Sequence, residues 1–194
     1  GGAAASADIL AELAPANAHI VHMPGHIQYL TGEYGVARSS FVQAFAVDST
    51  YMAQYGTPAY NNWNYVHNLS YLVANCAEDG RYRDGIRWAR KLEEVPLSNR
   101  RTIIFYQGRM ARVRLHLRYA EWDLAAAALT ELAANDTIDA SFAGRFTAGM
   151  LAYARGMLAV SSNAVEDAEN ELKKMTNITW LYMAGAPPRG DAYY

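Results

Sequence analysis

Apolar residues recur every three or four positions through most of the chain, a period typical of amphipathic helices. Glycine, proline and paired polar residues interrupt this pattern at intervals, and runs of β-branched residues are few. The sequence therefore predicts an all-α fold with no β-hairpin. The expected helices cover residues 6–14, 18–31, 34–51, 63–78, 82–94, 101–119, 122–134, 141–160 and 164–176.

The predicted helices are arranged in pairs because three of the turns between them share one form. A small residue ends the first helix, an aromatic residue two positions later opens the second, and another small residue follows three positions on. These triplets are Gly32-Tyr34-Ala37, Gly80-Tyr82-Gly85 and Ala120-Trp122-Ala125, and a fourth turn at 163–168 keeps only Ala168. Gly25 and Gly156 lie the same number of residues before the turns that follow them. At these positions we expect the paired helices to touch.

This recurring pattern of small and aromatic residues resembles the tetratricopeptide repeat family, although the turns are further apart than the about 34 residues of the standard repeat. The resemblance implies a solenoid of about four antiparallel helix pairs over residues 18–176, with a concave groove that binds ligands. Residues 1–17 are then an N-terminal segment or the remnant of a preceding repeat. The Pro187-Pro188 pair predicts an irregular tail over 177–194.

A closer resemblance is to bacterial tetratricopeptide-repeat proteins of unassigned activity, on four short segments. They are His-Met-Pro-x-His-Ile at 22–27, His-Asn-Leu at 67–69, an aromatic-containing turn at 118–122 and Tyr-Ala-Arg-Gly-Met at 153–157. Those proteins are longer, so we expect this chain to be an internal portion of a longer repeat protein. The resemblance carries no activity with it.

Composition narrows the classes of function. The formal net charge of −2 argues against non-specific binding to nucleic acid. A single cysteine, Cys76, excludes an internal disulfide framework and a cysteine-based zinc site, and we expect it to be a small buried apolar residue. No apolar run approaches the length of a membrane span, and the first residues show no signal-peptide pattern. The sequence therefore does not indicate a cellular compartment.

Four of the five histidines fall in the first two predicted helix pairs. His19, His22 and His26 have the spacing i, i+3, i+7, which places them on one face of a helix. The resemblance implies that this face lines the groove, and that His67 in the next repeat faces the same groove.

Three interpretations of the histidines remain open. They line the groove as polar residues hydrogen-bonded to Tyr29, Asn64 or Asn68, or they bind a peptide or small ligand. In the third interpretation they hold a transition metal through the imidazoles of His22, His26 and His67, although no carboxylate clearly joins them. We expect no cofactor under the first two interpretations, and a metal ion under the third.

The favoured hypothesis is a non-enzymatic scaffold, because no phosphate loop, serine elbow or catalytic carboxylate pair is recognisable. Its groove would bind a protein or peptide partner through His19, His22, His26, Tyr29, His67 and Asn68. The first alternative is self-association, in which solenoid ends stack into an oligomer or filament, favoured by 14 tyrosines and four tryptophans. The second alternative is a metal-binding protein built on the histidines.

Overall fold

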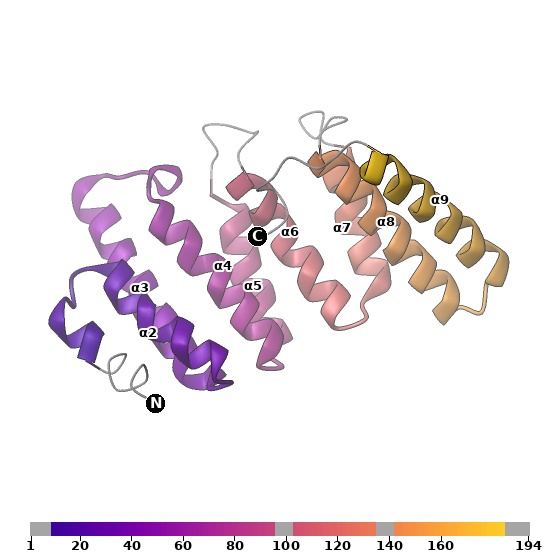
Figure 1. Cartoon of the computed structure of the whole chain (residues 1–194). Coiled ribbons are helices and arrows are strands. Elements are labelled where there is room, and N and C mark those ends of the chain that lie inside the picture. Colours follow the sequence, from indigo (N-terminus) through magenta and orange to yellow (C-terminus); the bar gives the residue numbers. More distant parts are fainter. Residues whose placement is uncertain (1–8, 96–102, 135–141, 185–194) are drawn as a thin grey trace. The chain divides into compact units, whose positions relative to one another are not determined.

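The computed structural model describes residues 9–95, 103–134 and 142–184, and these residues form helices and turns without any strand (Figure 1). This confirms the all-α prediction for the described part of the chain. The chain divides into two compact units, residues 1–99 and 100–194. Within the described ranges, no helix has the length and apolar character needed to cross a membrane.

The first unit holds a short helical stretch at residues 9–13 and then two packed helix pairs. The first pair is α2 (Ala18–Leu30) and α3 (Tyr34–Tyr55), and the second is α4 (Trp63–Glu78) and α5 (Tyr82–Glu93), with the short 3₁₀ helix η1 (Ala59–Asn61) between them. Each helix packs on the next, and α2 also touches α4. Side chains from α2 and α4 can therefore meet directly.

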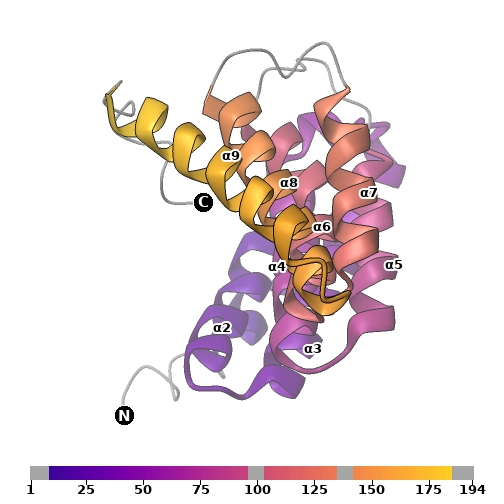
Figure 2. The same cartoon turned by 90° about the vertical axis from the view of Figure 1, so that its right-hand side faces the viewer.

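The second unit holds the pairs α6 (Ile103–Arg118) with α7 (Trp122–Ala133) and α8 (Phe142–Ser161) with α9 (Val165–Ala184). Each of these helices packs on the one that follows it, and both views show α9 lying along α8 (Figures 1 and 2). Met110, Val113, Leu129 and Ala154 are buried together in its core.

All four turns inside the pairs close in the same way, with one residue in the left-handed region and a backbone bond from the next residue back to the helix. That residue is Gly32 (φ 82°), Gly80 (φ 72°), Ala120 (φ 58°) or Asn163 (φ 57°). The backbone N–H groups that follow donate to the carbonyls of Gln28, Cys76, His116 and Ala159 over 2.8–2.9 Å. This is the Schellman arrangement, and it places the predicted aromatic residues Tyr34, Tyr82 and Trp122 at the first position of the second helix.

Two helices extend beyond their predicted ends. Helix α3 continues to Tyr55, where the Tyr51 and Tyr55 rings pack 4.7 Å apart between centroids. Helix α9 continues to Ala184, so the expectation of an irregular tail is wrong for residues 177–184. In this added part of the helix, Ile178 lies beside Gly149 of α8. Residues 1–8 and 185–194 lie outside the described residues.

Candidate functional site: a cluster of three histidines

The first unit brings together His22 and His26 of α2 and His67 of α4, which we call the histidine cluster. One ring nitrogen from each residue lies within 4.8 Å of the other two. The Nε2 atoms of His22 and His26 are only 2.8 Å apart, so one of them donates a proton to the other. The structure thus brings together the three imidazoles that the third interpretation of the sequence named.

Helix starts place the cluster. Asn17 caps α2, its side chain accepting from the backbone N–H groups of His19 and Ile20, and Asn62 caps α4 through the N–H of Tyr65. From these starts, His22 and His67 each lie about one turn into their helices. Pro24 is buried inside α2, and the helix continues through it to His26. The four-residue spacing then stacks His26 above His22 on one face.

Aromatic rings surround the histidine cluster and hold its geometry. The Tyr71 ring lies 4.4 Å from His26, 4.8 Å from His67 and 5.1 Å from His22 between centroids. Phe41 of α3 packs 4.8 Å from His22, and Trp63 stacks on His67 at 4.5 Å with an interplanar angle of 19°. His22 is fully buried, whereas His26 and His67 are half-buried. The cluster therefore has an inner and an outer side.

Burial keeps the cluster uncharged. It lowers the pKa of His22 to about 3, with further contributions from repulsion by His26 and His67. It lowers the pKa of His67 to about 4, again with repulsion from neighbouring histidines, and it lowers the pKa of His26. All three rings are neutral at pH 7, which is the state in which an imidazole offers a lone pair to a metal ion.

A buried carboxylate lies behind the cluster. Asp48 of α3 accepts hydrogen bonds from the side-chain amides of Asn62 (3.1 Å), Asn64 (2.9 Å) and Asn68 (2.8 Å). Burial raises its pKa, while these three hydrogen bonds lower it. This network gives the polar side chains of the α4 N-terminus a common anchor, so Asn64 and Asn68 bind Asp48 rather than the histidines.

Asn68 stands between Asp48 and His22. It lies close enough to His22 to oppose part of the lowering of the histidine pKa. No hydrogen bond of ordinary geometry joins them, however, because His22 Nδ1 and Asn68 Oδ1 are both buried without a partner among the described residues. A hydrogen bond from a protonated His22 Nδ1 to Asn68 Oδ1 would satisfy both atoms. Such a contact to the far nitrogen is what orients metal-binding histidines in proteins.

The remaining residues singled out from the sequence lie outside the cluster. His19 is exposed, and its ring stacks 6.4 Å from that of His22. Tyr29 packs against Tyr34 at 5.5 Å, one turn beyond His26. Cys76 is fully buried, as predicted, and burial raises its pKa to about 11.

Sequence reasoning missed Trp63 and Tyr71, which frame the cluster. They lie four residues before and four residues after His67, a spacing that already places all three on one helix face. Asp48 carries a weaker signal, as a lone carboxylate inside an otherwise uncharged stretch of α3. No sequence pattern links it to the asparagines of α4, because the contact crosses between helices.

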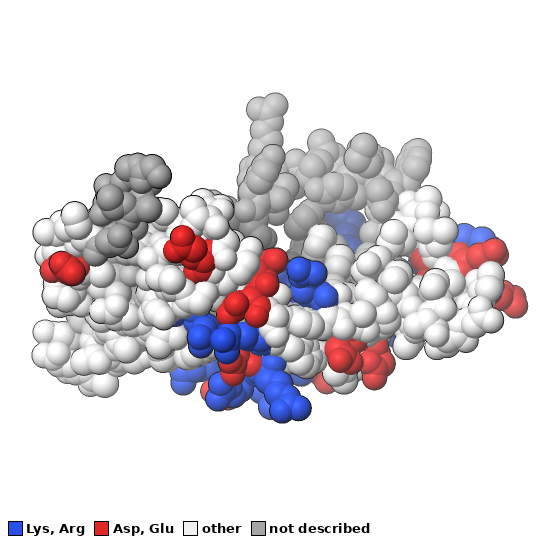
Figure 3. Space-filling view, turned by 90° about the horizontal axis from the view of Figure 1, so that it is seen from below, with Lys and Arg blue, Asp and Glu red and all other residues white. Residues whose placement is uncertain are grey.

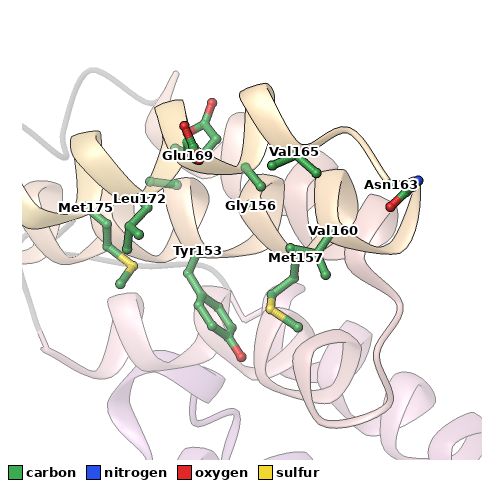
Figure 4. Close-up of a pocket in the computed structure, with 12 residues that line it drawn as sticks. Tyr153, Gly156, Met157, Val160, Asn163, Val165, Glu169, Leu172 and Met175 are labelled. Atoms are coloured by element: carbon green, nitrogen blue, oxygen red, sulfur yellow. The ribbon is translucent and has the colours of Figure 1, made fainter.

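A separate apolar groove lies between α8 and α9 in the second unit (Figure 4). It has a volume of about 430 Å³, and Tyr153, Met157, Leu172 and Met175 line it. It contains none of the residues that the sequence singled out for binding.

Comparison with family models, with curated proteins and with solved structures found no match to this chain. The resemblance to tetratricopeptide repeats therefore stays a prediction. Any assignment of function rests on the residues of the site.

Proposed function

We propose that the chain binds a divalent first-row transition-metal ion, such as Zn²⁺, through His22, His26 and His67. The observation that carries this proposal is the convergence of one ring nitrogen from each residue to within 4.8 Å. Nitrogens around a tetrahedral zinc ion are about 3.3 Å apart, since Zn–N bonds are about 2.0–2.1 Å long. Small side-chain rotations are enough to close the difference.

The chemistry of the donors favours this choice of metal. Neutral imidazoles suit zinc, copper, nickel and iron, whereas magnesium and calcium prefer oxygen ligands. His22 and His26 already share one proton between their Nε2 atoms. A metal ion would take the place of that proton, and the donor ring would carry its proton on Nδ1 instead. For His22, this Nδ1 proton would face Asn68, whose anchor is Asp48.

Three protein ligands leave a fourth position for water or another ligand. Closed zinc sites that serve only structure use four protein ligands, so an open site is typical of a metal that does chemistry or is carried. His26 and His67 are half-buried and lie on the outer side, where such a ligand would arrive.

The test is calorimetric titration of Zn²⁺ into the metal-free full chain without a histidine tag. We expect one equivalent to bind, and we expect the His26→Gln and His67→Gln variants to bind at least tenfold more weakly. His19→Gln is the matched control, because this exposed histidine of the same helix lies outside the cluster. Circular dichroism checks that each variant folds. Equal zinc binding by His19→Gln, His26→Gln and His67→Gln would contradict the proposal.

The finer architecture is also a proposal. The four identical turns and the packing of consecutive helices support tetratricopeptide-like repeats in each unit. The hypotheses of a peptide-binding scaffold and of self-association stay predictions of the sequence. His22 is fully buried, so a peptide would have to contact the exposed His19 and the half-buried His26 and His67 instead.

A further inference from the structure

A second cavity lies where the N-terminal ends of α2 and α4 meet α3. Its volume is about 530 Å³, within the usual range for small-molecule sites. We call it the Asp48 cavity, and its walls include Asn17, His19, Asp48, Tyr51, Trp63 and Asn64. It belongs entirely to the first unit and shares no residue with the histidine cluster.

The cavity contains a carboxylate without a cation. Asp48 is only 6% exposed, and its hydrogen-bond donors are three uncharged asparagine amides. None of the described residues forms an ion pair with it. Buried charges in proteins are normally paired, because leaving water is costly for a lone ion. The Asp48 cavity therefore lacks the positive charge that would complete it.

The surrounding sequence supplies no Lys or Arg for this role. Apart from histidines, residues 1–80 contain one basic residue, Arg38, whose charge acts on Asp84 and Cys76. His19 also lines the cavity, but it forms no ion pair with Asp48 in the described part of the chain. On the face drawn in Figure 3, the left-hand end carries acidic side chains without Lys or Arg, and the basic side chains gather further to the right. A permanently charged partner for Asp48 would have to come from a ligand.

The walls of the cavity suit a cationic ligand. Trp63 is 53% exposed and Tyr51 is 52% exposed, so both rings are accessible to a ligand in the cavity. Trp63 is held in place by its stacking on His67. The faces of tryptophan and tyrosine rings attract cations, and such rings recognise ammonium groups in other proteins.

We propose that the Asp48 cavity binds a small organic cation bearing an ammonium group, with Asp48 as its counter-ion and Trp63 and Tyr51 as its aromatic walls. The asparagines hold the carboxylate in position for this contact. The site is independent of metal in the histidine cluster, so the two proposals can fail separately.

The test uses the metal-free full chain and three probes of similar size. They are choline, its uncharged isostere 3,3-dimethylbutan-1-ol, and n-butylamine. Comparing choline with n-butylamine shows whether the site prefers a quaternary or a primary ammonium group. Nuclear magnetic resonance follows the indole N–H signal of Trp63. We expect one or both of the cations to shift this signal saturably, with at least tenfold higher affinity than the neutral isostere. Equal binding of all three probes, or no binding, would overturn the proposal.

Variants locate the site. We expect Asp48→Asn to weaken cation binding at least tenfold, and Tyr51→Ala to weaken it several-fold. Tyr51 is exposed, so Tyr51→Ala keeps the test valid if Asp48→Asn does not fold. Tyr60→Ala is the matched control, because Tyr60 is also exposed but does not line the cavity. Equal affinities of the Tyr51→Ala and Tyr60→Ala variants would overturn the assignment of the site.

Discussion

The Nε2 atoms of His22 and His26 lie 2.8 Å apart, with His22 fully buried and His26 half-buried. Two protonated imidazoles cannot occupy this arrangement, because both Nε2 atoms would carry a hydrogen. The pair is therefore uncharged or shares a single extra proton. This relationship links the proposed metal site to the stability of the first unit and leads to the first prediction.

We expect the metal-free protein to lose stability as the pH falls from about 6.5 towards 4. The pKa values of His22 and His67 are lowered to about 3 and 4 in the folded chain, whereas histidines in the unfolded chain accept protons near pH 6.5. Their contribution is complete above pH 6.5 and decreases by up to about 1.4 kcal/mol per pH unit and per histidine below it. Burial raises the pKa of Asp48 above its ordinary value of 3.8, and this has the opposite effect on stability. As the pH falls towards that value, the folded chain takes up a proton at Asp48 before the unfolded chain does, which offsets part of the loss.

Urea unfolding between pH 7 and pH 4, with a chelator present, measures this loss. The His67→Phe variant should show a shallower dependence on pH, because one of the histidines with a lowered pKa is removed. The His19→Gln variant should keep the full dependence. A wild-type slope in His67→Phe would contradict this account.

Replacing Asn68 by leucine should destabilise the first unit by about 1–3 kcal/mol. The change removes the 2.8 Å hydrogen bond to Asp48 Oδ2 and leaves the buried carboxylate with one donor fewer. We also expect weaker zinc binding, since Asn68 lies beside His22. Asn61→Leu is the control, because Asn61 is exposed and has no side-chain bond to Asp48. Thermal unfolding and zinc titration of both variants test this prediction. Equal losses of stability and of zinc affinity in the two variants would refute the role of Asn68.

Gly25 should not tolerate a methyl group. A Cβ added there would lie 2.7 Å from Cδ1 of Phe41, the ring that packs against His22. We expect Gly25→Ala to cost about 1–3 kcal/mol by overpacking, despite the higher helix propensity of alanine. Gly35→Ala serves as the control, since nothing lies within 4 Å of its added Cβ, and it should be neutral or stabilising. Denaturant midpoints distinguish the two, and similar midpoints would contradict the predicted contact.

Replacing Ala120 by glycine should stabilise the second unit by about 1 kcal/mol. Ala120 has φ 58°, in the left-handed region that costs a residue with a Cβ about 1–2 kcal/mol. The equivalent positions in the first unit already hold Gly32 and Gly80. Ala127→Gly, at an exposed position inside α7, should instead destabilise by about 0.5–1 kcal/mol. Thermal melting compares the two, and a lower midpoint for Ala120→Gly would contradict the prediction.

Local interactions made much of the fold readable from the sequence. Helical periodicity placed α4 at its observed bounds, and the pattern of small and aromatic residues located the turns. Gly25 was predicted to lie at a helix contact, and it lies against Phe41. These features depend on residues close in sequence, or on a close approach that only glycine permits. The fourth turn was harder to read, because Asn163 takes the left-handed position without the flanking aromatic residue.

The spacing of the histidines could be predicted for the same reason, since His22 and His26 share one face of a single helix. The tertiary structure alone decided that His67 reaches them and that His22 is buried. It also decided that Asp48 accepts hydrogen bonds from two asparagines of α4 and from the asparagine that caps this helix. It also showed that α9 continues past residue 176, where Ile178 lies beside Gly149 of α8. Contacts between helices depend on how the helices pack, and the period of a single helix does not encode the position of its neighbour.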